Sequence, residues 1–450
     1  MREAFKSVFL LVLIVSSFVQ TGMLLYSSPS YDEIRNGDNY VTPFKISDKY
    51  EKQVYELASP QQIMVHQDGK HQALYPGNSL YPTLMKKIHY APVEKASMIQ
   101  PSEKDWDDLL KKTPGLELRY YQPMPSGVIQ TLFSSEIDLS DLKEVTRMWV
   151  FVEKGNRVTF WFISDQESKV METSARINQF DRWISEAVNS NSAAMEPVFA
   201  NGSIKEEQGI PKPFYLPKKT MSVNHYVYQL SDPIKIDDMK TALFPNPRLV
   251  QSTLVLNKSY IYTDTSRTLQ YNTQNHSMIY SNPAPKSTDT GIPAEELDRI
   301  NLFMLRHGGW TGDYHLERMD EDPNAQLHHY IFRLLVRQFP VYWNSNAKGP
   351  DIDLDTIRLS ATDQGVSNYE RSLYYLLSAP EKTGTSRLPG KDDVLKAVKA
   401  QGISLQEIRS IHPGYSAVPR QKHVELQPVW VINRSNGKQW FIRSSESQGE

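Results

Sequence analysis

Cysteine is missing from all 450 residues of the sequence. This absence excludes disulfide bonds, thiolate nucleophiles and cysteine-ligated metal sites. An excess of charge of one sign is missing too, because 50 Lys and Arg residues stand against 52 Asp and Glu residues. No segment gathers basic side chains into a stripe that could follow a phosphate backbone. We therefore expect no nucleic-acid partner.

Local catalytic and metal-binding motifs are also lacking. The chain has no G-x-S-x-G nucleophile elbow, no H-E-x-x-H zinc motif and no P-loop. His328 and His329 are neighbours in a predicted strand and must point to opposite faces, so they cannot chelate one metal together. Asp351, Asp353 and Asp355 alternate along a predicted strand and are interpreted as a solvated acidic face rather than a calcium site. The sequence thus predicts no catalytic residue, no metal and no cofactor.

One long uncharged run is present near the start. Val8 to Tyr26 spans nineteen residues without a charge, close to the about 20 that a helix needs to cross a bilayer core. Arg2 and Lys6 precede the run, so the positive-inside rule makes residues 1–7 a cytoplasmic tail and places the chain after the run outside the cell. A cleaved signal peptide is the alternative, but the run is longer than an ordinary h-region and no Ala-x-Ala follows it. We predict a transmembrane anchor that is retained.

Polar residues interrupt the predicted anchor on one side. Ser16, Ser17, Gln20 and Thr21 share a helical face at about 100° per residue. Small hydroxylated residues allow another helix to approach closely, and Gln20 could hydrogen-bond across such an interface. Alternatively, the hydroxyls bond to their own helix and Gln20 reaches the lipid headgroups. The first reading makes these four residues a partner-binding face.

The rest of the chain is predicted to hold a stalk and three domains. Residues 27–48 are rich in Ser, Asn, Asp and Pro without a period, which is typical of a stalk. An N-terminal extracytoplasmic domain is expected at 49–200, a central domain at 205–345 and a C-terminal domain at 346–450. Runs of strands alternate with single helices, so the predicted class is α+β, with antiparallel sheets.

Strands and helices follow from local patterns. Residues 145–152 and 157–164 are rich in β-branched and aromatic side chains and predict a hairpin. A helix is predicted from Pro293, with a C-terminal glycine cap at Gly308. The HGG sequence at 307–309 resembles the oxyanion loop of some lipases, but without a nucleophile elbow it is interpreted as this helix end. The other predicted strands are 116–121, 170–173, 225–230, 259–263, 268–272, 277–280, 314–319, 352–359, 369–378, 408–417, 424–433 and 439–443, and the other predicted helices are 177–188 and 392–401.

The order of strands, helix and strands occurs twice, once in residues 205–345 and once in 346–450. The segments GDYHLERM and HHYIFRLL of the first copy correspond to GYSAVPRQ and VWVINRS of the second. This similarity is one of pattern rather than identity. It predicts a structural duplication in which each copy has an antiparallel sheet with a helix on one face.

Three sequence blocks and the anchor, in this order, resemble a known family. The blocks are YYQPMPSGVIQTLF from Tyr120, YIYTDTSRTLQYNTQNHSMIYSNP from Tyr260 and HGGWTGDYHL from His307. Together they resemble the YycH family, membrane-attached regulators of the WalK/WalR (YycG/YycF) two-component system of Gram-positive bacteria. The resemblance covers nearly the whole chain, and none of the blocks is a catalytic motif.

The resemblance implies one transmembrane helix and three extracytoplasmic domains, the last two similar to each other and to the partner protein YycI. It also implies control of the sensor kinase WalK through contacts that include membrane helices, and it supplies no catalytic residue. The favoured hypothesis is a non-enzymatic accessory regulator of cell-wall homeostasis signalling. One alternative is an anchored hydrolase of wall polymer or peptide. Another is a PepSY-like module that binds peptides or inhibits proteases, suggested by the hairpin PVWVINRSNGKQWFI at 428–442.

Overall fold

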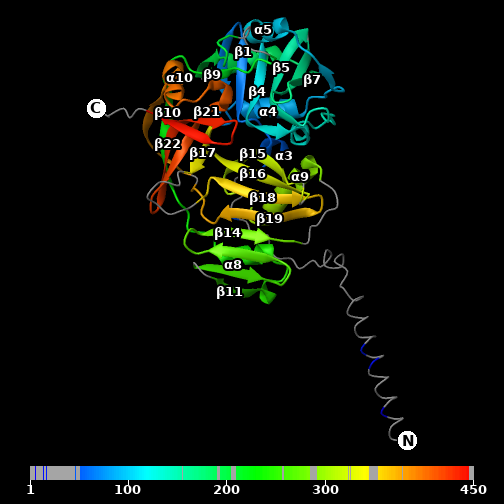
Figure 1. Ribbon diagram of the computed structural model, residues 1–450, viewed down its shortest axis with the longest axis vertical. Coiled ribbons are helices and arrows are strands. Elements are labelled where there is room, and N and C mark those ends of the chain that lie inside the picture. Colours follow the sequence, from blue (N-terminus) through cyan, green and yellow to red (C-terminus); the bar gives the residue numbers. More distant parts are fainter. Residues whose placement is uncertain are drawn as a thin grey trace. The chain divides into compact units, whose positions relative to one another are not determined.

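The computed structural model describes most of the chain after residue 50. The described residues are 51–154, 156–189, 193–203, 209–255, 258–283, 291–322, 324, 326–343, 353–377 and 379–444, together with Lys6, Ile14, Ser17 and Ile46. Residues 44–450 form one compact unit. Within the described part, its strands build one nine-stranded and one 14-stranded sheet (Figure 1). The predicted α+β class with predominantly antiparallel sheets is confirmed.

The first sheet is built entirely from residues before 217. Its strands are β1 (Gln62–Gln67), β2 (Lys70–Leu74), β3 (Ser97–Ile99), β4 (Gly115–Pro125), β5 (Glu144–Lys154), β6 (Arg157–Ser164), β7 (Lys169–Arg176), β8 (Ala193–Val198) and β9 (Phe214–Leu216). They lie in the order β3-β7-β6-β5-β4-β1-β2-β8-β9 with antiparallel neighbours. The predicted hairpin of residues 145–164 is confirmed as β5 and β6.

Apolar side chains cover both faces of this sheet at β5 and β6. The helices of this region are α3 (Val54–Leu57), α4 (Tyr81–His89), α5 (Glu103–Lys111), α6 (Ser126–Ile129) and α7 (Phe180–Asn189). Trp106 of α5 packs with Trp149 and Trp161 on one face, whereas Phe160 and Phe162 belong to the main core on the other. A strand buried on both faces needs a nearly continuous apolar run, which explains the sequence RVTFWFIS.

The second sheet contains the remaining strands. They are β10 (Met221–Gln229), β11 (Gln251–Val255), β12 (Ser259–Thr263), β13 (Thr268–Asn272), β14 (Ser277–Ser281), β15 (Asp313–Asp322), β16 (Leu327–Val336), β17 (Phe339–Trp343), β18 (Thr356–Thr362), β19 (Gly365–Ser372), β20 (Glu381–Leu388), β21 (Ile408–Pro419), β22 (His423–Arg434) and β23 (Gln439–Arg443). Their order is β11-β12-β13-β14-β19-β18-β16-β17-β21-β22-β10-β20, with β15 beside β16 and β23 beside β22. The pairing of β17 with β21 is parallel.

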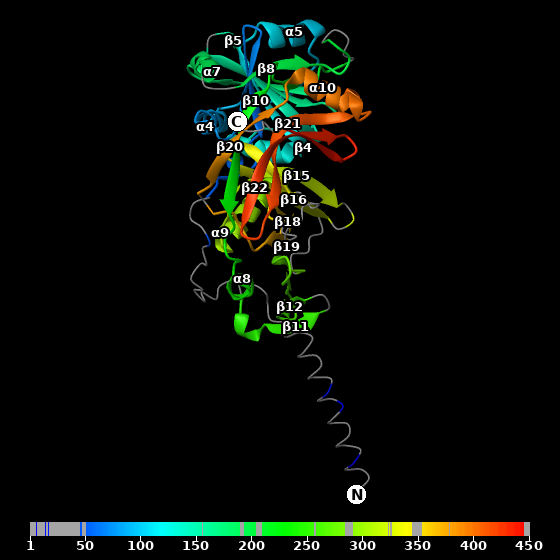
Figure 2. The ribbon, with the colours of Figure 1, turned by 90° about the vertical axis from the view of Figure 1, so that its left-hand side faces the viewer.

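Strand pairing in the second sheet crosses the predicted division at residue 345. Strand β10 pairs with β20 and with β22 near the end of the chain (Figure 2). Strand β14 pairs with β19. The sequence EKTGTSRL of β20 is polar and contains a glycine, so local patterns did not predict this strand. Segments from both predicted domains therefore share one hydrogen-bonded sheet.

The HGG sequence ends a helix, as predicted. Helix α9 (Pro293–Arg306) has Pro at its first positions and Glu295 in its first turn. Gly308 has a φ of 105°, and the N–H of Gly309 donates to the carbonyl of Met304 at 2.7 Å. This 6→1 bond is the Schellman motif, which satisfies a carbonyl that the helix leaves unpaired. The other helices of the second half are α8 (Ile236–Leu243) and α10 (Lys391–Ala400).

Two predicted strand boundaries were wrong. The strand predicted at 352–359 is β18 and begins at Thr356; Ile352 lies outside the described residues. The strand predicted at 369–378 is β19 and ends at Ser372. The N–H of Leu373 still donates to the carbonyl of His276 opposite it, but the residues after Leu373 leave β14 and bond to residues 229–231 instead. The apolar composition of LYYLL predicted a longer strand, but between Ser372 and β20 the described residues make only an isolated bridge, between Leu376 and Leu230.

Candidate functional site

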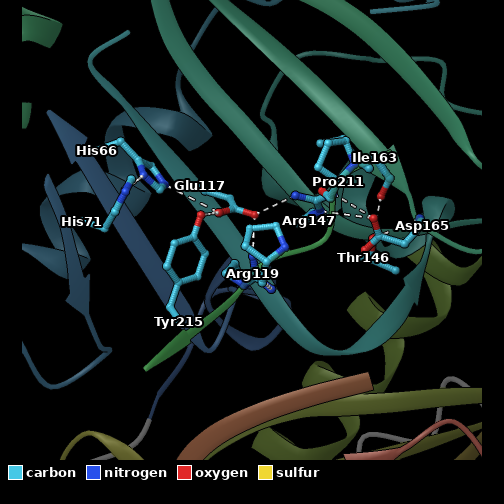
Figure 3. Close-up of polar contacts among 11 residues, drawn as sticks. His66, His71, Glu117, Arg119, Thr146, Arg147, Ile163, Asp165, Pro211 and Tyr215 are labelled. Carbon is cyan, nitrogen blue, oxygen red and sulfur yellow. Dashed lines mark hydrogen bonds and ion pairs between the residues drawn. The ribbon is translucent and has the colours of Figure 1, made fainter. Parts of the chain in front are cut away.

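The most concentrated buried charge lies on the first sheet, in a network that we call the Glu117 cluster (Figure 3). It combines acidic, basic, imidazole and phenol side chains from the five strands β1, β2, β4, β5 and β9 and from the residue that follows β6. Its members are His66, His71, Glu117, Arg119, Arg147, Asp165 and Tyr215. Burying this much charge costs free energy unless every group is paired. The Glu117 cluster is therefore the first candidate for a functional site.

Strand register brings the cluster together. Asp68 and Gly69 have positive φ values of 51° and 68°, the requirement of a two-residue type I′ hairpin turn. The turn pairs His66 of β1 directly with His71 of β2. Arg119 of β4 lies opposite Arg147 of β5. Like charges directly opposite repel, and a carboxylate between the two guanidinium groups offsets this repulsion.

Glu117 provides that carboxylate. Its side chain is fully buried, and its Oε1 accepts hydrogen bonds from Arg119 at 2.6 Å and Arg147 at 3.1 Å. The Tyr215 hydroxyl donates to Oε2 at 2.8 Å. Burial raises the pKa of Glu117, but Arg119, His66 and Arg147 outweigh burial, and the pKa lies well below its usual range. Glu117 is therefore an ionised carboxylate held in place by its hydrogen bonds, and it is not suited to act as a general acid or base.

Arg147 extends the network to a second carboxylate. Its guanidinium donates to Asp165 at 2.9 Å and to the carbonyl of Pro211 at 2.5 Å. Thr146 donates its hydroxyl to Asp165 at 2.8 Å. Burial raises the pKa of Asp165, and Arg147 outweighs that effect, so the pKa of Asp165 is lowered. Arg147 is thus held between two ionised carboxylates.

The two histidines form a buried neutral pair. Their Nδ1 atoms are 2.7 Å apart, so one of them donates its proton to the other. His66 also stacks on Trp149, with ring centroids 4.4 Å apart. Burial lowers the pKa of His66. Burial, followed by the influence of His66, lowers the pKa of His71 to about 4 from an ordinary value of 6.5.

Mild acid is expected to destabilise the protein through His71. Because its pKa is lower in the folded chain than in the unfolded chain, the unfolded chain binds more protons between pH 6.5 and 4, and stability is lost as the pH falls through this window. For His71 alone the loss between pH 7 and 5 is about 2 kcal/mol. Urea unfolding of the full-length chain at both pH values measures it.

The variants His71→Gln and His423→Gln make this test specific. His71→Gln should remove about 2 kcal/mol of the pH dependence. His423 lies near the protein surface with a side chain 38% exposed, so His423→Gln should retain the dependence. An unchanged slope in His71→Gln would contradict the assignment.

The cluster offers little room for a substrate. The adjoining cavity, which Arg119, Arg147 and Asp165 help to line, measures about 30 Å³, enough for about one water molecule. The side-chain oxygens of Glu117 are engaged by cluster members. Within the part of the chain that the structure describes, no group of three or more His, Asp or Glu could hold a metal ion. The arrangement suits a structural joint.

The joint connects the first sheet to the start of the second half. Arg119 donates to the carbonyl of Pro213 at 2.9 Å, so the cluster fixes Pro211, Pro213 and Tyr215 just before β10. A second junction lies at β21, where the ring of His412 stacks on Tyr121 with centroids 3.6 Å apart. Nearby, the Ser410 hydroxyl donates to the carbonyl of Tyr121 at 3.0 Å. Polar and aromatic contacts thus attach both ends of the second half to the first sheet.

The predicted partner-binding face is mostly outside the described residues. Ser16, Gln20 and Thr21 are not described, and Ser17 is helical and exposed. Among the positions that the structure describes, no helix has the length and apolarity to cross a bilayer. The transmembrane face therefore remains a prediction.

The other residues singled out in the sequence are structural. His328 hydrogen-bonds to buried Glu296 at 2.7 Å, whereas His329 hydrogen-bonds to Ser360 at 2.8 Å, as expected for opposite faces of a strand. The solvated acidic face was wrong for Asp355, which is only 4% exposed and pairs with Arg333. The reason is that β16 supplies a cation opposite the end of this segment, which makes burial of the carboxylate tolerable.

Asp353 and Asp351 complete the predicted acidic face. Asp353 is about half exposed and pairs with Arg358 at 3.5 Å, and Asp351 lies outside the described residues.

Sequence reasoning also missed the Glu117 cluster. The dipeptide Asp68-Gly69 was a usable signal for the pairing of His66 with His71, because it favours a hairpin turn.

These features define a cysteine-free α+β protein of two sheets whose halves are joined by buried hydrogen bonds and an aromatic stack. Two family models match the chain: "YycH protein, N-terminal domain" over residues 3–193 and "YycH protein, C-terminal domain" over residues 211–444. The chain belongs to the YycH family. The second match begins at Pro211, whose carbonyl accepts the hydrogen bond from Arg147 of the Glu117 cluster.

A curated relative and a solved structure agree with this assignment. The "Two-component system WalR/WalK regulatory protein YycH" of Bacillus subtilis (strain 168) is 24% identical over 452 residues, covering 97% of this chain and 95% of the relative. The crystal structure of YycH from Bacillus subtilis superposes with a TM-score of 0.68 at 19% identity, covering 88% of this chain and 98% of that chain. The second likeness shows that the fold is shared.

Proposed function

We propose that this protein is a non-enzymatic accessory regulator of a WalK/YycG-like sensor histidine kinase. The observation that carries the proposal is the similarity to the WalR/WalK regulatory protein along 97% of the chain. The locked geometry of the Glu117 cluster also supports it, because the most charged buried site has no space for a substrate. A coupling free energy of about 1–3 kcal/mol between regulator and kinase is sufficient to change signalling several-fold.

We also propose that residues 8–26 anchor the chain in the cell membrane, with residues 1–7 in the cytoplasm and the domains outside. The support is the uncharged run itself and the basic residues before it. Ser16, Ser17, Gln20 and Thr21 would form the face that meets the kinase helices. A YycI-like protein is the expected second partner, and control of cell-wall homeostasis is the expected output, as the family resemblance implies.

The three-domain organisation and the duplication belong to the same proposal. In the second half, α9 is followed by the long hairpin β15–β16 and the short strand β17. Similarly, α10 is followed by the long hairpin β21–β22 and the short strand β23. This repeated order supports a duplicated module. Strand β10 precedes the first copy in the sequence but pairs with β20 and β22 of the second copy. The two copies would therefore share strands instead of following one another as separate domains.

Deleting residues 1–26 tests the anchor. We expect the deletion to abolish both association with the kinase, measured by crosslinking in cells, and the effect on a WalR-dependent reporter. The reason is that a membrane helix confines both proteins to one surface and raises their effective concentration. Full regulation by the shortened chain would contradict the proposal.

A paired substitution tests the contact face within an intact anchor. Ser17→Leu with Gln20→Leu should weaken association and shift reporter output, because it removes the small and hydrogen-bonding groups. Val15→Leu with Phe18→Leu alters the opposite side of the same helix and is the matched control. If both pairs left association and output unchanged, the proposed face would be wrong.

A further inference from the structure

An open groove lies between α4, the end of β7 and the start of α7 in the first half of the protein. Its volume is about 470 Å³, and Lys86, Lys87, Tyr90, Arg176 and Trp183 are among the residues that line it. Figure 2 shows α4 and α7 on the same side of the first sheet. Small-molecule sites occupy roughly 300–1,000 Å³, so the groove is large enough for one.

The charge of the groove is positive. Lys86, Lys87 and Arg176 line it, and none of its lining residues is acidic. Two carboxylates of this region pair with other arginines: Glu94 pairs with Arg157 at 3.3 Å, and Glu186 pairs with Arg182 at 2.9 Å. Three cations facing one concave surface favour an anionic ligand, because their potentials add there.

Aromatic rings lie beside these cations. The Nζ of Lys87 is 3.7 Å from the centre of the Trp183 ring, a cation–π contact that holds the ammonium group at the groove. Tyr90 is 63% exposed, and its ring makes an edge contact with His89, with centroids 4.7 Å apart. Tyr90 thus presents a ring to solvent next to the cationic side chains.

Helix electrostatics alone does not account for the groove. Lys86 and Lys87 lie in the last turn of α4, where the helix dipole favours cations. Arg176, however, ends a strand, and the exposure of Tyr90 has no packing benefit. Thr83 and Asn178 add polar side chains to the lining, which suits a ligand that carries hydroxyl groups as well as an anion.

We propose that this groove binds a sugar phosphate, with the phosphate held by Lys86 and Arg176 and the sugar ring placed against Tyr90. Guanidinium and ammonium groups bind phosphate oxygens through charge-assisted hydrogen bonds. An open groove can accept the same chemistry from a free sugar or from a phosphorylated polysaccharide. The inference stands apart from the proposed regulation of the kinase, since binding can be measured without any other protein.

Calorimetric titration of the full-length chain tests the proposal. Glucose 6-phosphate should bind at least about tenfold more tightly than glucose or inorganic phosphate, since each lacks one half of the contact. Arg176→Gln and Tyr90→Ala should each weaken this binding by about tenfold. Lys399→Ala changes an exposed lysine in the last turn of α10 and, as the control, should leave binding unchanged.

Each other result would overturn part or all of the proposal. If inorganic phosphate bound as tightly as glucose 6-phosphate, the proposed contact of the sugar with Tyr90 would be wrong. If glucose bound as tightly as glucose 6-phosphate, the proposed contact of the phosphate with the cations would be wrong. No binding of glucose 6-phosphate at millimolar concentration would overturn the site. Titration with phosphorylated dextran distinguishes a polymer from a free sugar. Tighter binding of phosphorylated dextran than of glucose 6-phosphate assigns the groove to a phosphorylated polysaccharide, and the reverse order assigns it to a free sugar phosphate.

Discussion

Replacing Glu117 with alanine is expected to lower the free energy of unfolding by about 3–5 kcal/mol, the usual cost of breaking a buried ion pair. The carboxylate accepts hydrogen bonds from Arg119, Arg147 and Tyr215 within a fully buried environment. Its removal leaves two guanidinium groups facing each other across β4 and β5 with one acceptor fewer. The large effect follows from the uncompensated positive charge more than from the lost contacts.

Urea unfolding of the full-length chain at pH 7 measures this loss. Glu94→Ala is the matched control, because Glu94 also pairs with an arginine, but both side chains are more than half exposed. Exposed pairs contribute about 0–1 kcal/mol, so the control should remain close to the unmodified protein. Similar unfolding curves for the two variants would show that the Glu117 cluster does not stabilise the fold.

Replacing Trp310 with alanine is expected to cost about 3–5 kcal/mol as well, through a cavity in the core. The indole is fully buried, lies 4.9 Å from the Phe332 ring centre and donates from Nε1 to Asn301 at 2.9 Å. Asn301 in turn donates to the carbonyl of Lys52 at 2.9 Å. The substitution therefore empties a core site and leaves a buried amide oxygen without its donor.

Two further variants separate these contributions when the melting temperature and the free energy of unfolding are measured. Trp310→Phe retains much of the ring volume but loses the donor, and a loss of about 1–3 kcal/mol is expected for the unsatisfied Asn301 oxygen. Trp440→Ala alters a partly exposed tryptophan on β23 and should cost less than Trp310→Ala. The core assignment would be wrong if Trp440→Ala were the more damaging change.

Local elements could be predicted from the sequence because their signals lie within a few residues. Hairpin β5–β6 combines a β-branched and aromatic composition with a short connection. The end of α9 combines a basic residue with Gly308 in a left-handed conformation. In both cases the physical cause, side-chain shape or backbone freedom, belongs to the residues themselves.

Long-range features could not be predicted in this way. The partners of Glu117 come from β4, β5 and the segment before β10. The cluster can therefore be identified only when the strand register is known. Strand β20 has no apolar alternation and owes its conformation to pairing with β10. Asp355 was assigned to the surface because Arg333, its partner, lies more than 20 residues earlier in the chain.

The position of β10 has a consequence for biosynthesis. This strand lies near the middle of the chain, and its neighbours β20 and β22 are translated roughly 150 and 200 residues after it. At about 5–20 residues per second, β10 waits on the order of ten seconds or more with unpaired N–H and C=O groups. The first sheet can complete itself during that wait, whereas the second cannot close before translation ends. Chaperone dependence should therefore be concentrated in the second half of the chain.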